Sequence, residues 1–283
     1  MKYLLIIMLL ILPRTAWGQN VEYTAADSAK IVKILCKATI EAGDKNRMIY
    51  FGKQFLGIPY VAHTLEEGES EHLIVNIHGL DCTTFVETVL ALYLCDKNNE
   101  RTFKDFCNHL VQIRYRQGKM TDYTSRLHYF TWWGEDNESM GLVRQVTNNN
   151  EAPFTAIQTI QINYMSRHPD YYKHLKANHN FIPVIRRYEQ ASNGKKYRYI
   201  PKSRLNGSSQ ELQDVHTGDI ISIITNKDGL DTSHVGIVFW DLGKLHLMHA
   251  SSLQKKVVMD EKTFYDYSQA QKSHLGIRVY RPL

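Results

Sequence analysis

Apolar residues recur at helical spacing through the first part of the chain. From about residue 24 to residue 56 the pattern predicts two helices, with Thr24 as a capping start and a break at Gly43. A third helix is expected to begin at Cys82 and a fourth near residues 102–117. These helices would pack beside one another, with the third among them.

After residue 212 the pattern changes to short apolar runs that are typical of strands. Four strands are expected, at residues 219–225, 233–240, 244–249 and 276–280. A helix near residues 261–268 interrupts them. Helices followed by an antiparallel sheet predict an α+β fold. The segment 119–205 is less regular, and we interpret it as an elaborating insertion within one domain that spans residues 19–283.

The first eighteen residues have the pattern of a secretory signal peptide. A basic residue, Lys2, precedes an apolar run that ends at Pro13, and small residues stand at positions 16 and 18. The run is too short to cross a bilayer, so we expect no stable membrane insertion. The sequence therefore predicts an exported protein, with the periplasm and full secretion both open as its destination.

Charge changes this picture little. The chain has 34 basic and 29 acidic residues, and removal of Lys2 and Arg14 with the signal leaves 32 against 29, a net charge of +3. This balance is too mild to indicate a nucleic-acid partner. No histidine or cysteine pair has zinc-finger spacing and the motif HExxH does not occur, so neither a metal nor another cofactor is predicted.

The four cysteines do not predict a disulfide framework, even in a compartment that permits one. Cys82 and Cys95 are expected to share one helix, where thirteen residues at 1.5 Å each separate them by about 20 Å. Cys82 should therefore be free. Of Cys36, Cys95 and Cys107, at most one pair could close.

Cys82 is the candidate for chemistry. It follows the capping candidate Asp81 and opens the third helix, which places its sulfur at a helix N-terminus. Unpaired N–H groups and the positive end of the helix dipole favour a thiolate there, so we expect its pKa to fall from about 8.5 toward or below neutrality. The alternative is a buried cysteine that acts as a small hydrophobic residue.

Two histidines lie on a predicted hairpin. If residues 240–243 form a four-residue loop, Phe239 pairs with Lys244, and His234 lies opposite His249 on the same face with Cβ atoms about 5 Å apart. His246 falls on the other face. A base and the group that orients it would then be in contact.

These residues suit acyl transfer. Cys82 would attack an amide carbonyl, His234 would take up and return the proton, and His249 would hold the tautomer of His234. The N–H of Cys82 would donate to the oxyanion, with the hydroxyl of Tyr60 as a candidate second donor.

The motifs DCTTFV at residues 81–86, HVGI at 234–237 and HASS at 249–252, in that order, resemble NlpC-type papain-fold peptidoglycan hydrolases. Four further motifs resemble the N-acetylmuramoyl-L-alanine amidase-like branch of that superfamily: FLGIPYVA at 55–62, YTSRLHYF at 123–130, YMSRHP at 164–169 and GLDTSH at 229–234.

This resemblance implies a papain-like fold and cleavage of the amide between the lactyl group of N-acetylmuramic acid and L-alanine. It also implies that peptidoglycan fragments (muropeptides), including anhydro-sugar turnover products, are the substrates. The triad would be Cys82, His234 and His249, with Tyr60 beside it. Two alternatives stay open: a D-glutamyl-diamino acid endopeptidase with the same triad, and a non-catalytic glycan-binding module.

The mid-chain segment supplies candidates for substrate binding. Aromatic side chains can stack on sugar rings, and a guanidinium can bind a carboxylate in bidentate fashion. Tyr123, Arg126 and His128 are the candidates from this segment, and Ser233 is a fourth, next to His234. Trp132 and Trp133 are more simply explained as anchors of the segment to the core.

Overall fold

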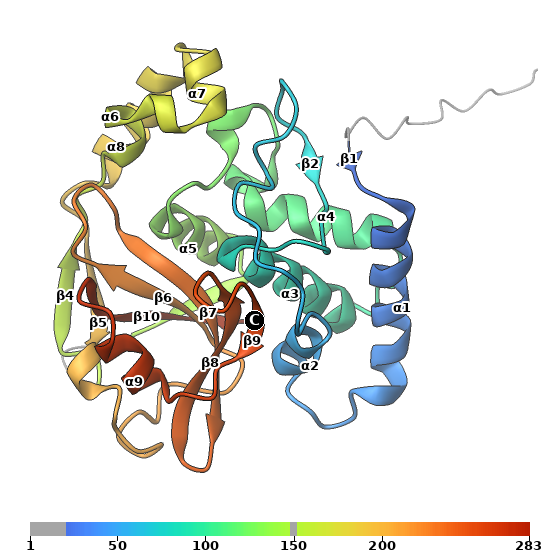
Figure 1. Cartoon of the computed structure of the whole chain (residues 1–283), viewed down its shortest axis with the longest axis vertical. Helices are drawn as coiled ribbons and strands as arrows, with labels where there is room; N and C mark the ends of the chain where they lie inside the picture. Colours follow the sequence, from blue (N-terminus) through green and yellow to red (C-terminus); the bar gives the residue numbers. More distant parts are fainter. Residues whose placement is uncertain (1–20, 148–151) are drawn as a thin grey trace, which may run out of the picture.

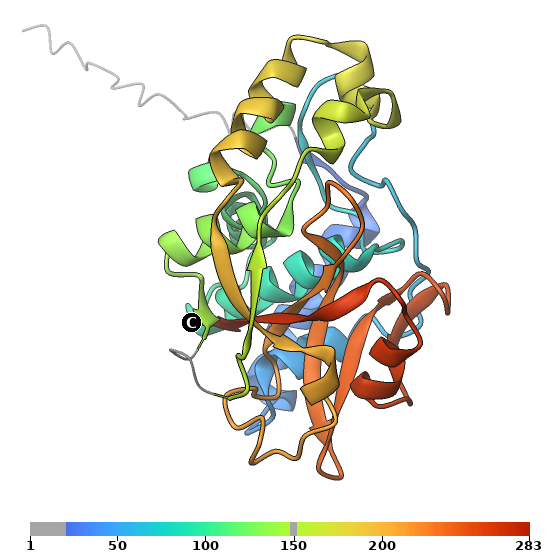
Figure 2. The same cartoon turned by 90° about the vertical axis from the view of Figure 1, so that its left-hand side faces the viewer.

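Helices from the first part of the chain lie beside an antiparallel sheet formed mainly by the last part, as Figures 1 and 2 show. The computed structural model describes residues 21–147 and 152–283. The predicted signal peptide, residues 1–18, lies outside the described residues. Within them, no helix is both long and apolar enough to span a membrane.

The helices are α1 (Ala25–Glu41), α2 (Arg47–Lys53), α3 (Cys82–Lys97), α4 (Phe103–Arg114), α5 (Phe130–Ser139), α6 (Tyr164–Arg167), α7 (Lys173–Ala177), α8 (Phe181–Ser192) and α9 (Phe264–Gln269). Short 3-10 helices occupy Arg116–Gly118, Tyr123–Ser125, Pro169–Tyr171 and Lys202–Arg204. The predicted helices near residues 24–56, 82 and 102–117 are confirmed.

The large sheet has the strand order β4-β5-β10-β6-β7-β8-β9, with β3 also paired to β10, and its neighbouring strands are antiparallel. Its strands are β3 (Val143–Val146), β4 (Ala156–Thr159), β5 (Lys196–Pro201), β6 (Ile220–Thr225), β7 (Thr232–Asp241), β8 (Lys244–Ser251), β9 (Lys256–Met259) and β10 (His274–Pro282). A separate pair, β1 (Val21–Glu22) and β2 (Leu73–Ile74), is parallel.

Helix α3 is the element that positions the candidate nucleophile. It contacts α1, α2 and α4, and it also contacts β7 and β8 of the sheet. From Thr84 to Cys95 all but one of its residues are buried. A buried ion pair, Glu87 Oε2 to Arg114 Nε at 2.7 Å, joins it to α4, and Arg114 also donates to the carbonyl of Ile74. A shift of α3 relative to α4 would separate the two charges and leave each of them buried without a partner. The pair therefore holds α3 in place against α4.

The segment 119–205 is more regular than its sequence suggests. It contributes β3, β4 and β5 to the large sheet, so the expectation that strands begin only after residue 212 is wrong. These strands are short, and the side chains of β4 alternate between half-buried and exposed, which gives little apolar signal. Helices α6, α7 and α8 gather at one end of the molecule, in yellow at the upper left of Figure 1.

Candidate active site

Cys82 lies at the first position of α3, as the sequence predicts. Asp81 is the N-cap: its Oδ1 accepts from the Thr84 N–H at 2.8 Å, and the Thr84 hydroxyl accepts from the Asp81 N–H at 2.9 Å. This reciprocal cap fixes the first turn. The N–H of Cys82 belongs to that turn, where no carbonyl within the helix can accept from it.

Strand β7 approaches the sulfur directly. The backbone N–H of Val235, the residue after His234, faces the Cys82 thiol and acts to lower its pKa. Cys82, Ser233 and His234 also line one cavity of about 190 Å³, together with residues 127–130, Met165 and Tyr172 of the mid-chain segment. The structure therefore brings the predicted nucleophile and base to one concave site.

The two histidines are in contact. His234 Nε2 lies 2.6 Å from His249 Nδ1, and the ring planes meet at 85°. The predicted register is wrong by two residues: Asp241 pairs with Lys244 around a two-residue turn, so His249 lies opposite Gly236. Because side chains alternate with a period of two, this shift keeps both rings on the same face. His246 pairs with Phe239 and falls on the other face, as expected.

Gly236 makes this diagonal contact possible. A Cβ on residue 236 would lie 3.0 Å from the carbonyl oxygen of Met248 and 3.1 Å from the Cβ of His249. Either contact is tighter than van der Waals separation allows, so a side chain at this position would displace His249.

We expect Gly236→Ala to lower the free energy of unfolding by about 1–3 kcal/mol, because overpacking forces the backbone of the hairpin to shift. Activity should fall more than the folded fraction does, because the His234 to His249 contact is distorted. Thermal unfolding and specific activity measured on the same sample check this. Lys244→Ala, on an exposed residue of the same hairpin, is the control. Full activity of Gly236→Ala would contradict the geometry.

Two further side chains complete the site, and the sequence did not identify them. The carboxylate of Asp260 lies 3.6 Å from His249 Nε2, a fully buried nitrogen without another partner in the described structure. The ring of Tyr267, on α9, lies 5.3 Å from that of His249 and 6.5 Å from that of His234. Both come from the connection after β9, which no local motif relates to the histidines.

The order of these groups determines the tautomers. His249 and the backbone N–H of Lys262 hold the pKa of Asp260 below its ordinary value, so its carboxylate is an acceptor only. With the Nε2–H of His249 facing Asp260 at 3.6 Å, an ion-pair distance too long for a hydrogen bond, Nδ1 of His249 is the acceptor for the Nε2–H of His234. The lone pair of His234 is thereby left on Nδ1, which is the atom that can accept a proton.

Burial opposes charge on both reacting groups of the site. Burial, followed by the neighbouring Asp81 carboxylate, raises the pKa of the Cys82 thiol to about 12, although the Val235 N–H and Thr83 act in the opposite direction. Burial, followed by His249, lowers the pKa of His234 well below 6.5. Burial thus opposes the helix terminus, which favours a thiolate, and a thiol pKa near neutrality stays a prediction.

Tyr60 lies beside the nucleophile. Its backbone pairs with Leu80, and its N–H donates to the carbonyl of Lys255 at 2.9 Å. Burial, and then the charges of Cys82 and Asp81, raise the pKa of its hydroxyl to about 12. A hydroxyl that keeps its proton can donate to an oxyanion, so the geometry is compatible with the predicted role.

The four candidates for substrate binding separate into two pairs. His128 and Ser233 line the cavity. Tyr123 is buried, with its ring 4.3 Å from that of His128, and its carbonyl accepts from His128 Nε2 at 2.8 Å, so it positions His128 from behind. Arg126 is buried, and its guanidinium is paired with Glu66 and Glu71 at 2.7 and 2.6 Å.

Arg126 therefore does not present a free guanidinium to a substrate carboxylate, contrary to the interpretation from sequence. Trp132 and Trp133 are also buried, and the indole N–H of Trp132 donates to Ser192 at 2.8 Å. They anchor the segment, as expected.

All four cysteines are free. Among the described residues, the only group of three or more side chains placed to hold a metal ion is Cys95, Glu100 and His109, at the other end of α3 from Cys82.

One family model matches most of the chain, and several solved structures resemble it. A family model described as AmiA-like, N-acetylmuramoyl-L-alanine amidase-like, matches residues 50–277. A crystal structure of an N-acetylmuramoyl-L-alanine amidase from Bacteroides uniformis is 39% identical, with a TM-score of 0.77 over 83% of this chain and 97% of that one. No curated protein matches the chain.

Two other solved structures are similar. One from Bacteroides fragilis, provisionally described as a xylanase, is 41% identical, with a TM-score of 0.76 over 82% of this chain and 99% of that one. A Legionella pneumophila protein is 23% identical, with a TM-score of 0.70 over 91% and 94% of the two chains, and shares the fold.

Proposed function

Because the chain belongs to the AmiA-like, N-acetylmuramoyl-L-alanine amidase-like family, we propose that it hydrolyses the amide between N-acetylmuramic acid and L-alanine with Cys82 as nucleophile. The family implies peptidoglycan as substrate. The observation that carries the cysteine mechanism is the pair His234 and His249 in direct contact, with Cys82 and His234 lining the same cavity. A helix-terminal thiol packed against an antiparallel sheet also supports a papain-like, NlpC-type architecture.

In the first half of the reaction, Nδ1 of His234 removes the thiol proton of Cys82 as the sulfur attacks the lactyl carbonyl carbon. The N–H of Cys82 and the hydroxyl of Tyr60 donate to the oxyanion. The C–N bond then breaks, the amine of L-alanine takes the proton from His234, and the lactyl group stays on the sulfur as a thioester.

In the second half, His234 removes a proton from water, and the resulting hydroxide attacks the thioester. The C–S bond breaks, N-acetylmuramic acid leaves with its lactyl carboxyl group free, and His234 returns the proton to the sulfur. Neutral resting forms of Cys82 and His234 suit this scheme, because the base is free to accept at each attack.

Mass spectrometry of the products of a defined muropeptide, in both its reducing and its anhydro-sugar forms, tests this function. We expect free sugar and an intact stem peptide. A sugar still joined to L-alanyl-D-glutamate would instead establish the endopeptidase. No cleavage of either form would favour a glycan-binding module. The cavity of about 190 Å³ is smaller than the roughly 300–1,000 Å³ of typical ligand pockets, so it fits only the groups that flank the scissile bond.

A glycosidase, as the description of the Bacteroides fragilis neighbour would suggest, needs two carboxyl groups across the glycosidic bond. Among the described residues that line the cavity, Asp231 is the only acid, and its Oδ2 accepts from the Thr131 N–H at 2.6 Å. The cavity thus favours amide chemistry over glycoside hydrolysis.

Asp260→Asn is expected to lower kcat about tenfold with little change in KM, because the amide can donate to His249 and so favours the wrong tautomer of the relay. Steady-state kinetics on the muropeptide measure both constants. The neighbouring exposed residue supplies the control, Glu261→Gln, which should leave kcat unchanged. An equal loss of kcat in the two variants would show that Asp260 does not orient His249 and His234.

The pH profile follows from His234. Because burial lowers the pKa of this ring well below 6.5, the neutral base persists as pH falls, and kcat/KM should decline only at pH values below 6.5. The raised pKa of Cys82 predicts no alkaline gain from thiolate formation up to pH 9 or so. Measurement of kcat/KM between about pH 4 and pH 9 checks this. If kcat/KM falls to half of its maximum on the acid side at pH 6.5 or above, the prediction is contradicted. Any apparent pKa obtained from this profile belongs to Cys82 and His234 as a coupled pair and not to either residue alone.

Peptidoglycan lies outside the cytoplasm, and the pattern of residues 1–18 supports export, with the periplasm as the proposed compartment. Fractionation of cells that express the full chain tests this. Recovery of the protein with residues 1–18 intact in the cytoplasm would overturn it.

A further inference from the structure

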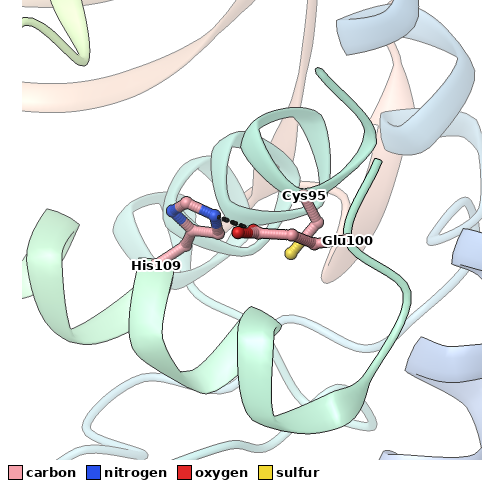
Figure 3. Close-up of side chains that lie close together, drawn as sticks. All are labelled: Cys95, Glu100 and His109. Atoms are coloured by element: carbon pink, nitrogen blue, oxygen red, sulfur yellow. Dashed lines mark hydrogen bonds and ion pairs between the residues drawn. The ribbon is translucent and has the colours of Figure 1, made fainter. Parts of the chain in front are cut away.

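A second chemical cluster, of Cys95, Glu100 and His109 (Figure 3), lies near the end of α3 opposite to Cys82. Cys95 belongs to the last turn of α3, Glu100 follows in the link to α4, and His109 lies on α4. One ligand atom from each, a thiol sulfur, a carboxylate oxygen and an imidazole nitrogen, all lie within 4.8 Å of one another.

The imidazole of His109 has an acceptor at each nitrogen. Nε2 lies 2.5 Å from Glu100 Oε2, and Nδ1 lies 3.1 Å from Gln112 Oε1. A neutral imidazole has one N–H and cannot donate to both. If Nδ1–H is directed to Gln112, Nε2 presents a lone pair toward Glu100 and Cys95, and a cation between them would satisfy all three. A metal-bound histidine commonly donates its other N–H to such an outer partner.

Burial and charge balance also fit a divalent ion. The side chain of Cys95 is fully buried, that of His109 is 11% exposed, and that of Glu100 is 37% exposed. A divalent cation would displace the thiol proton to solvent. One thiolate, one carboxylate and one neutral imidazole then balance its two charges, which leaves the buried site neutral.

We propose that Cys95, Glu100 and His109 form a site for one divalent transition-metal ion, and that Zn²⁺ fits best. Zinc accepts sulfur, nitrogen and oxygen ligands in tetrahedral geometry at about 2.0–2.3 Å, which separates the ligand atoms by about 3.5 Å. The half-buried Glu100 side chain can move outward by the roughly 1 Å that this requires. Water on the exposed side supplies the fourth ligand.

Such an ion would join the end of α3 to α4. Cys82 lies thirteen residues away, about 20 Å along the helix, so the ion takes no part in the amide chemistry. Its expected effect is stability: the metal should raise the melting temperature and should leave the rate of amide hydrolysis unchanged. The site is therefore independent of the function proposed above.

The test is titration of the purified protein with Co²⁺ and then Zn²⁺, in a Cys82→Ser background so that the active-site thiol cannot contribute. Co²⁺ should give one equivalent of a thiolate-to-metal charge-transfer band, and Zn²⁺ should displace it. Cys95→Ser should lose the band and weaken Zn²⁺ binding by at least about 100-fold, and Gln112→Ala should weaken it about tenfold.

Cys107→Ser is the matched control, because Cys107, on α4, is a buried thiol like Cys95 but is not one of the three proposed ligands. It should keep the band, one equivalent of Zn²⁺ and the rise in melting temperature. Circular dichroism shows whether each variant is folded, and Glu100→Gln, on a half-buried side chain, tests the site if Cys95→Ser does not fold. No charge-transfer band in the folded Cys82→Ser protein, or an undiminished band in Cys95→Ser, would overturn the proposal and leave His109 and Glu100 as an ion pair.

Discussion

Cys82→Ala is expected to reduce release of the stem peptide from a sugar-bearing muropeptide by at least about 10⁴-fold. The reason is that the reaction proposed here begins with a carbon–sulfur bond, and the other three thiols of the chain lie outside the cavity. In the variant, water would have to attack the amide carbonyl itself. That path lacks the thioester intermediate, which divides one high barrier into two smaller ones. Mass spectrometry of timed samples measures the loss.

Two controls separate chemistry from folding. Cys36→Ala, on the exposed thiol of α1, should keep full activity. The Cys82→Ala protein should still bind the muropeptide, because its cavity is otherwise unchanged, and calorimetry can measure that binding. If Cys82→Ala retains more than about one tenth of the activity, another group is the nucleophile and the cysteine mechanism fails.

His234→Ala should lose nearly as much activity as Cys82→Ala, because the thiol stays protonated unless a base removes its proton. Residues that act as one unit are not additive, so the double variant should be no slower than either single one. Burst experiments with an activated ester substrate can show whether the thioester still forms.

His246→Ala is the control for this experiment. That histidine lies on the opposite face of the same hairpin, with its ring 5.4 Å from that of Phe239, and its removal should leave kcat unchanged. His249→Ala should fall between the two, with a loss of roughly 100-fold, because His234 keeps its proton-accepting nitrogen but loses its orientation. A loss in His246→Ala equal to that in His234→Ala would show that the effect is structural.

The hairpin shows what sequence reasoning can and cannot provide. The two faces of β7 and β8 were predictable because alternation depends only on parity. The register depends on the turn, and here Leu242 and Gly243 both have positive φ, at 44° and 75°. A two-residue turn of this kind usually carries asparagine or aspartate before glycine. Leucine is unusual there, and the local sequence favoured a longer loop.

Other features depend on contacts between distant parts of the chain. Asp260 meets His249 only because β9 pairs with β8 and reverses the chain. Arg126 looked like a substrate ligand because its partners, Glu66 and Glu71, lie more than fifty residues earlier. The sequence placed Cys82 at a helix terminus correctly but gave no measure of its burial, which acts to raise the pKa of the thiol.

The two walls of the cavity have different freedom to change. Cys82 and His234 come from α3 and β7, which are packed on many sides, whereas Leu127, His128 and Tyr172 come from connections of the mid-chain segment and Met165 from the short helix α6. Replacement of residues in that segment could alter which fragment is accepted while the reacting groups stay in place. Relatives with the same reacting residues should therefore differ in substrate specificity mainly through this mid-chain wall. A chimera that carries the mid-chain segment of a relative offers a route to enzymes that cut other cell walls.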